Sequence, residues 1–267
     1  MVFSHCSIAQ DIVFPGHESD YYVTKLLEHA LSYSPQKHYH LKFNNQGLPK
    51  TRVFKMIAAN EDIDVIAAGS TLEREKHLLP IKFPILKGLH GWRIPLVAKN
   101  HQNIFDTELS LTEFKSFKPG QLHSWSDTKI LESNGIIVEK ASLYQGLFSM
   151  LATNRFDYLP RSLIEIDGEL EKFKDLAITK DKNALIHYPT AYYFYVNKER
   201  KSLATDILYG LEQSLIDGSF ENMFAQYYGH FIERVNQENR KIYRLKNSTL
   251  PSDTPFSRQE LWLTFNN

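Results

Sequence analysis

Hydrophobic residues in the first seventy positions switch between a period of two and a period near 3.6. The segments 11–14 and 63–68 are short apolar runs, and 39–43 alternates between apolar and polar side chains, so all three are predicted strands. Helical spacing after Ser19, the expected N-cap, and again over 49–59 predicts two amphipathic helices between them. This order is typical of a parallel sheet with helices on its faces.

A second series of the same kind follows a stretch rich in proline and glycine. It comprises predicted strands over 94–99, 121–125, 136–139 and 156–159. One helix is expected to begin with Ser126 or Asp127 as its cap and to stop at Asn134 and Gly135, and another follows Ser142. The aromatic segment 189–197 is predicted to be extended, and two amphipathic helices follow it, separated by Asp217 and Gly218.

These patterns predict an α/β protein of two lobes. We expect 1–10 to be a tail or the remnant of a signal peptide, 11–98 and 198–267 to form lobe 1, and 99–197 to form lobe 2. Two chain crossings between α/β lobes predict a two-strand hinge with a cleft. Ligands of open α/β sheets bind beyond the carboxyl ends of the strands, so the loops there are the candidate site.

Composition narrows the class of function. The chain has 267 residues, 31 basic and 31 acidic side chains and a net charge of zero, which does not favour nucleic acid or an anionic membrane as a partner. Its apolar runs are far shorter than the roughly 20 residues of a membrane span. The single cysteine, Cys6, excludes an internal disulfide and a cysteine-based zinc cluster. Aromatic residues, at 13%, suit a core or a pocket for a small organic ligand.

Several short motifs occur in an order that points to a known family. The segment 68–74 (AGSTLER) is similar to the Thr-x-x-Arg segment of family 3 extracellular solute-binding proteins, which have the type II periplasmic binding fold. The resemblance continues through Phe83-Pro84-Ile85, the crossing at Lys99, the loop 120–127 and the segment 154–157, and covers most of 12–231. The sequence most resembles a divergent branch with Trp-x-Asp in the second-lobe loop.

The resemblance implies a periplasmic receptor that captures an amino acid or a related carboxylate in the cleft and delivers it to an ABC permease. It also implies that Arg74 pairs with the carboxylate of the ligand, while the backbone of Gly69, Ser70 and Thr71 adds donors. The chemistry agrees, because a guanidinium binds a carboxylate through two parallel hydrogen bonds. We expect a monomer with no cofactor, no metal and no stable membrane insertion.

Further candidates for ligand contact lie in the loops of the second lobe and near the first strand. They are Trp125, Ser126, Asp127, Arg93, Arg161 and Glu18. Family members that bind amino acids place an aspartate about five residues after the one matching Asp157, but here that register falls on Arg161 and Ser162. An unpaired buried ammonium group costs several kcal/mol. The ligand is therefore either a carboxylate or dicarboxylate, or an amino acid held by Asp127, Glu18 or Glu165.

Other interpretations remain open. Arg74 belongs to an alternating charged run that is also typical of a solvated helix face. The acidic residues of 165–171 are interpreted as a solvated helix end, and Trp92 as a core residue. His38 and His40 share one strand face, but no third ligand has suitable local spacing. No catalytic motif is present, so the prediction is a non-enzyme; the alternatives are an enzyme acting on a small acid, or a ligand sensor without a transport role.

Overall fold

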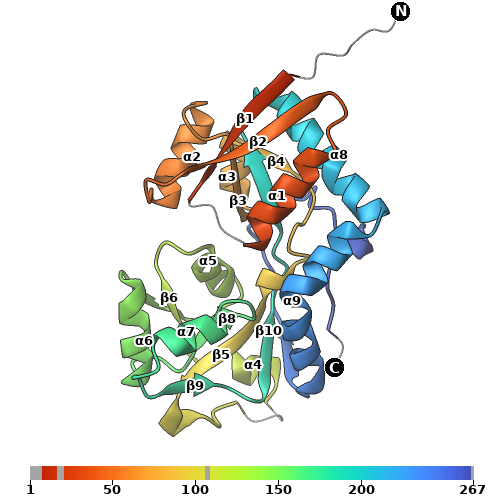
Figure 1. The fold of residues 1–267 in the computed structure, drawn as a ribbon. Helices are drawn as coiled ribbons and strands as arrows, with labels where there is room; N and C mark the ends of the chain where they lie inside the picture. Colours follow the sequence, from red (N-terminus) through yellow and green to blue (C-terminus); the bar gives the residue numbers. More distant parts are fainter. Residues whose placement is uncertain (1–7, 17–20, 106–108, 266–267) are drawn as a thin grey trace, which may run out of the picture. The chain divides into compact units, whose positions relative to one another are not determined.

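The computed structural model describes residues 8–16, 21–105 and 109–265. The described residues divide into two compact units. Unit 1 draws on Met1–Leu86, Ala191–Gly229 and Pro251–Leu261, and unit 2 on Lys87–Thr190, His230–Leu250 and Trp262–Asn267. Each unit combines strands with helices (Figure 1). The α/β class predicted from the periodicity is confirmed.

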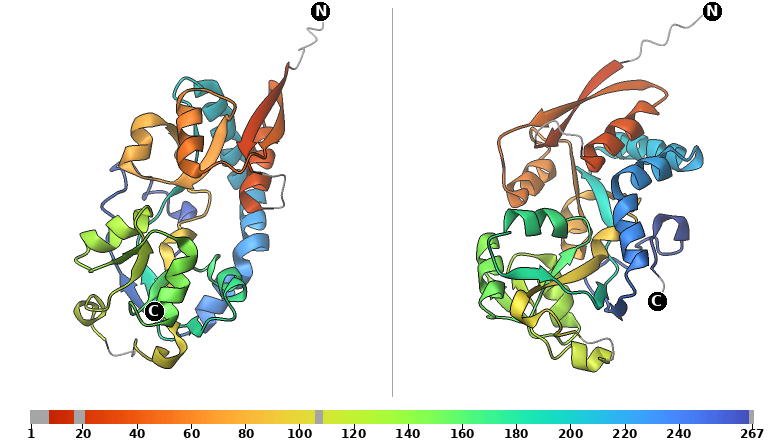
Figure 2. Two further views of the ribbon diagram at one scale, coloured as in Figure 1. Left: turned by 90° about the vertical axis from the view of Figure 1, so that its left-hand side faces the viewer. Right: turned by 60° about the horizontal axis from the view of Figure 1, so that its bottom comes forward.

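Unit 1 contains two small sheets and the helices that pack on them (Figures 1 and 2). Its strands are β1 (Ile8–Pro15), β2 (Lys37–Asn44), β3 (Val65–Gly69), β4 (Leu79–Ile81) and β11 (Tyr192–Val196). Its helices are α1 (Tyr22–Ser32), α2 (Lys50–Ala58), α3 (Leu72–His77), α8 (Lys201–Ile216) and the first part of α9 (Ser219–Gln237), with the short η3 (Gln259–Leu261). Strands β1 and β2 are parallel, whereas β11 lies antiparallel between β3 and β4.

Helices α1 and α8 show why this sequence folds as it does. The predicted apolar stripe of α1 is buried, and its Leu26, Leu27 and Ala30 are fully excluded from solvent. Helix α8 packs against α1 so closely that Gly210 faces the Ala30 carbonyl. Tyr21 occupies the N-cap position of α1 and its side chain does not cap. Ser19, the N-cap predicted from the sequence, lies outside the described residues.

Unit 2 is built on a larger sheet with the strand order β12-β10-β5-β8, in which β9 also pairs with β5. These strands are β5 (Trp92–Ala98), β8 (Leu159–Ser162), β9 (Ile178–Lys180), β10 (Ala184–His187) and β12 (Lys241–Arg244), and a parallel pair is formed by β6 (Gly120–Leu122) and β7 (Glu139–Ala141). The helical segments are η1 (Leu89–Gly91), η2 (Lys99–His101), α4 (Leu111–Phe114), α5 (Ser126–Ser133), α6 (Tyr144–Ala152) and α7 (Ile166–Lys172).

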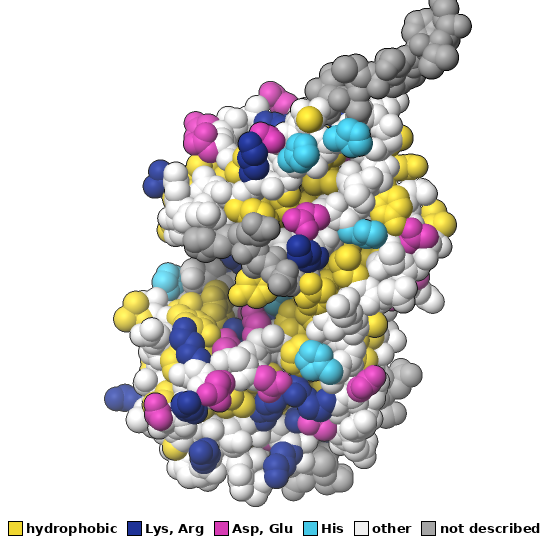
Figure 3. Space-filling model, viewed as in Figure 1, with side chains coloured by type: hydrophobic (Ala, Val, Ile, Leu, Met, Phe, Trp, Pro, Cys, Tyr) yellow, Lys and Arg dark blue, Asp and Glu magenta, His cyan; other side chains and the backbone are white. Residues whose placement is uncertain are grey.

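Aromatic residues fill much of the core of unit 2. Phe105, Phe114 and Tyr158 are fully buried and meet ring to ring, and Phe114 stacks on Tyr243 with centroids 4.1 Å apart. The high aromatic content of the chain is thus used largely for packing. Lysine and arginine are interspersed with acidic side chains over the visible face of unit 2 (Figure 3), as the balanced composition suggests. Within the described ranges, no helix is long and apolar enough to span a bilayer.

Several boundaries differ from the sequence prediction. The compact units divide after Leu86 and after Thr190, earlier than the crossings expected at 98 and 197, and α9 begins in unit 1 but ends in unit 2. The strands predicted over 136–139 and 156–159 each begin three residues later, as β7 and β8. The cause in β8 is pairing with β5, which places the polar Arg161 and Ser162 opposite Ile94 and Arg93.

A half-buried histidine in unit 2 should make stability depend on pH. His187 stacks on Trp92 at 4.0 Å, and burial, reinforced by Arg244, lowers its pKa from 6.5 to about 4. Between these two pKa values His187 is protonated in the unfolded chain but neutral in the folded one. The free energy of unfolding therefore falls as the pH falls from 6.5 toward 4. We expect the free energy of unfolding to drop by about 2 kcal/mol between about pH 7 and pH 5, measured by urea denaturation. A His187→Gln variant should lose this slope, and an unchanged slope would contradict the assignment.

Candidate functional site

Arg74 is a largely buried cation in unit 1. Its guanidinium carbon lies 4.5 Å from the centroid of the Phe54 ring and 5.9 Å from that of Tyr195. Nη1 donates to the Gly69 carbonyl, and Nε is buried without a hydrogen-bond partner among the described residues. Burial lowers the pKa of Arg74. The side chain is therefore held inside the unit and does not belong to a solvated helix face.

No carboxylate of the described residues forms an ion pair with Arg74. After Tyr195 and Tyr192, Glu75 is the carboxylate that favours its charge, but Glu75 binds Lys82 at 3.1 Å and accepts a hydrogen bond from Ser70 Oγ at 2.6 Å. Arginine is rarely buried without an acid partner, because removing its charge from water is costly. This unpaired guanidinium is the feature of unit 1 that best suits an anionic ligand.

The neighbours of Arg74 in the Thr-x-x-Arg segment have local structural roles. Thr71 is the N-cap of α3, and its hydroxyl accepts from the Arg74 amide at 3.2 Å. The Ser70 amide donates to the Ala191 carbonyl at 2.7 Å, and Gly69 pairs with Tyr192 in the sheet. The Ser70 amide is thus already occupied, so the prediction that this backbone adds ligand donors is weakened for Ser70.

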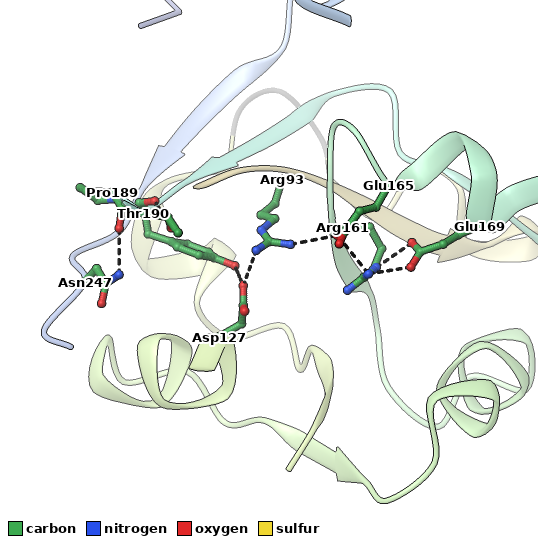
Figure 4. A network of polar contacts seen from close by, with 9 residues as sticks. Arg93, Asp127, Arg161, Glu165, Glu169, Pro189, Thr190 and Asn247 are labelled. Carbon is green, nitrogen blue, oxygen red and sulfur yellow. Dashed lines mark hydrogen bonds and ion pairs between the residues drawn. The ribbon is translucent and has the colours of Figure 1, made fainter. Parts of the chain in front are cut away.

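Unit 2 contains a chain of charged side chains that the sequence predicted only in part (Figure 4). Arg93 on β5 binds Asp127 on α5, with Nη2 and Oδ1 2.8 Å apart. The hydroxyl of Tyr188, just after β10, donates to the same aspartate oxygen. Asn247 Nδ2 donates at 2.8 Å to the carbonyl of Pro189, next to Tyr188, and so supports that segment. The Asp127 carboxylate is thereby held by both Arg93 and Tyr188.

Arg161 on β8 is held in a similar way. Its Nε and Nη2 donate to the two oxygens of Glu169 at 2.7 and 2.6 Å, which is the forked geometry of a strong arginine–carboxylate pair. Tyr144 on α6 donates to the same carboxylate at 2.6 Å. The guanidinium carbon lies 4.6 Å from the Trp125 ring centroid. Trp125 therefore packs on Arg161.

Glu165 lies between these two pairs (Figure 4). Its Oε2 is 3.1 Å from Nη2 of Arg161 and 3.6 Å from Nη1 of Arg93. Burial alone would raise the carboxyl pKa values of Asp127 and Glu165, but the surrounding cations hold both below their ordinary values. Asp127 and Glu165 are consequently charged at neutral pH.

The structure brings some predicted site residues together and separates others. Arg93, Asp127, Arg161 and Trp125 belong to the network of unit 2, whereas Ser126 is exposed and Trp92 is fully buried in the core, as predicted. The N-cap of α5 is Trp125, so neither Ser126 nor Asp127 caps the helix; the Asp127 carboxylate binds Arg93 and Tyr188 instead. Glu18 lies outside the described residues.

The interpretation of the acidic run 165–171 as a solvated helix end holds for Glu171, which is exposed, but is wrong for Glu169. Glu169 is only 7% exposed, because its carboxylate neutralises the buried Arg161. Sequence reasoning also missed Tyr144, Glu169 and Tyr188 as members of the network. The spacing of Arg161, Glu165 and Glu169 at intervals of four was an available signal, whereas nothing local marked the two tyrosines. His38 and His40 are exposed on β2, and the described residues contain no cluster of potential metal ligands.

Comparison with known proteins identifies the fold. No family model and no curated protein matches the sequence. Solved structures do match: the probable amino-acid ABC transporter extracellular-binding protein ytmK of Bacillus subtilis is 19% identical with a TM-score of 0.63, over 83% of this chain and 98% of that one. A Salmonella typhimurium periplasmic binding protein with high arginine specificity is 15% identical with a TM-score of 0.55, over 82% and 99%.

A third similar structure concerns glutathione import through GshT and a cystine ABC importer in Streptococcus mutans. It is 12% identical with a TM-score of 0.57, over 83% of this chain and 95% of that one. The chain therefore has the two-lobed α/β fold of the extracellular solute-binding proteins of amino-acid ABC transporters, as the sequence resemblance predicted.

Proposed function

We propose that this protein is a non-catalytic, periplasmic solute-binding protein that captures a small carboxylate-bearing ligand and delivers it to an ABC permease. The fold supports a solute-binding role. The observation that carries the proposal is Arg74, a largely buried guanidinium without an acid partner among the described residues. A ligand carboxylate supplies the missing counter-charge, and the stacking of Arg74 on Phe54 holds the guanidinium ready to receive it.

The class of ligand follows from what the site offers. Arg74 selects a carboxylate, because two parallel donors match its two oxygens. Amino acids and simple carboxylates are therefore both included in the proposal.

A thermal-shift screen tests the proposal. The protein is heated with individual amino acids, dicarboxylates and related small acids, and a true ligand at a hundred times its Kd should stabilise it by about 2.7 kcal/mol. Arg74→Ala should abolish the gain, because the charge-assisted pair is lost. Arg52→Ala, which removes an exposed arginine of α2, is the matched control and should leave the gain unchanged.

Two outcomes would contradict the proposal. The first is a protein that no small acid or amino acid stabilises. The second is turnover of a compound in the panel, which would favour an enzyme on the same fold. Since Arg74→Ala also removes packing on Phe54, the unliganded melting temperature of each variant is measured and only the ligand-dependent increment is compared.

A further inference from the structure

Glu165 occupies an unusual position, between two arginines that are almost completely buried. The side chains of Arg93 and Arg161 are 8% and 7% exposed, whereas that of Glu165 is 38% exposed. Both ion pairs of Glu165 with the arginines are made through one oxygen, Oε2, at 3.1 Å to Arg161 and 3.6 Å to Arg93. A partly exposed carboxylate thus contacts two buried guanidinium groups through a single oxygen.

Neither arginine needs Glu165 for its own neutralisation. Asp127 pairs with Arg93, and Glu169 pairs with Arg161 in a forked geometry. These two cations and two anions already balance, and the tyrosine hydroxyls of Tyr188 and Tyr144 complete the hydrogen bonding. The third carboxylate, that of Glu165, is not needed for these two ion pairs. Its side chain is also the most exposed of the three.

The surroundings of Glu165 retain polar atoms without partners. Nε of Arg93 is buried and, within the described residues, has no hydrogen-bond partner, and the same is true of Ser162 Oγ. Arg93 and Ser162 are directly opposed in the antiparallel pairing of β5 and β8, so their side chains are neighbours on one face of the sheet. Unsatisfied buried donors of this kind are rare in folded proteins and mark a place where a further acceptor fits.

We infer that the position taken by the Glu165 carboxylate is a binding site for the carboxylate group of a small ligand, and that Glu165 is an internal competitor which leaves when the ligand binds. The inference rests on the proposed solute-binding function and extends it, because it gives unit 2 an anion site of its own. Arg93 and Arg161 are the residues that bind the incoming group, and Ser162 is the additional donor.

The opposite assignment, a site at which Glu165 receives a ligand cation, fits the geometry less well. Oε2 lies within 3.6 Å of nitrogen atoms of two guanidinium groups, and a cation placed there is repelled by both. Arg161, His90 and Arg93 all favour the negative charge of Glu165. Exchanging it for a ligand carboxylate leaves the net charge unchanged, so the exchange carries no added cost of burying charge.

An internal competitor weakens ligand binding by a predictable amount. The apparent Kd equals the intrinsic Kd divided by the fraction of molecules in which the site is open, so removing the competitor tightens binding. If Glu165 occupies its position in most molecules, its removal should strengthen carboxylate binding about fivefold or more. A residue that merely stabilises the fold would not produce tighter binding when it is replaced.

The test is isothermal titration calorimetry with three probes: acetate, glutarate and L-glutamate. The wild type is compared with Glu165→Gln, which keeps the shape, and Glu165→Ala, which empties the position. Glu171→Gln is the matched control, since Glu171 lies on α7, whose N-cap is Glu165, is 76% exposed and among the described residues forms an ion pair with Lys174 alone. We expect both Glu165 variants to bind glutarate at least about fivefold more tightly than the wild type, with the control unchanged.

Three results would overturn the inference: no tightening in either Glu165 variant, no binding of any probe to any variant, or weaker binding of L-glutamate alone, which would mean that Glu165 receives an ammonium group. Arg74→Ala is titrated in parallel to separate this inference from the proposed function. If the wild type binds an acid through Arg74 but the Glu165 variants do not tighten, only the inference fails. If no acid of the wider screen binds the wild type, the proposed function fails.

Discussion

Replacing Glu169 by glutamine is expected to lower the free energy of unfolding by about 3 kcal/mol or more, because it leaves the buried Arg161 without its main counter-charge. Arg161 makes two hydrogen bonds to Glu169, at 2.7 and 2.6 Å, and Tyr144 depends on the same carboxylate. In this variant Glu165, 3.1 Å from Arg161, remains as a second carboxylate next to the guanidinium. The measurement is urea denaturation at neutral pH.

The control for this prediction lies two residues further along α7. Glu171 is exposed and pairs with Lys174 at 3.0 Å, so Glu171→Gln should change the free energy of unfolding by less than about 1 kcal/mol. The same chemical change is thus made once in a buried network and once on the surface. Equal effects at the two positions would show that the Arg161 pair is not a structural element of unit 2.

Gly210→Ala should destabilise unit 1 by about 3 kcal/mol or more, since overpacking against backbone is costly and neither helix can retreat without opening the core. A Cβ at this position would lie 1.8 Å from the Ala30 oxygen and 2.5 Å from its carbonyl carbon. Both atoms belong to the backbone of α1, which has no flexible end to move aside. Thermal and urea denaturation of the variant measure the loss.

Gly229 provides the matched control in the neighbouring helix. A Cβ there meets nothing within 4 Å, so Gly229→Ala should raise stability by up to about 1 kcal/mol through helix propensity alone. The two substitutions are chemically identical and differ only in what the added methyl group meets. A Gly210→Ala variant as stable as the wild type would mean that α1 and α8 do not pack through this contact.

The periodicity of hydrophobic residues predicted most helices and the α/β class, because the spacing of a few neighbouring residues determines an amphipathic stripe such as that of α1. Strand positions were less accurate. In β8, pairing with β5 decides which residues are in the sheet, and it recruits Pro160, Arg161 and Ser162, which have little intrinsic preference for a strand. Strands β9, β10 and β12 were not predicted, since each is short and depends on neighbours distant in the chain.

Site residues that belong to a short sequence motif were predicted. Site residues that the fold brings together from distant parts of the chain were missed. The Thr-x-x-Arg spacing identified Arg74 directly. Tyr188 and Asp127 are 61 residues apart, and Tyr144 and Glu169 are 25 apart, so no local pattern connects them. Glu169 of the acidic run was misinterpreted for the same reason, because the cation that buries it belongs to a different element.

The measurement that tests the central claim most directly is a crystal structure of the protein with the ligand found in the thermal-shift screen. The account predicts that two carboxylate oxygens of the ligand lie about 2.8 Å from nitrogen atoms of the Arg74 guanidinium, completing the ion pair that no described residue supplies. A bound ligand that leaves Arg74 attached only to the Gly69 carbonyl, with no contact to its guanidinium, would contradict it.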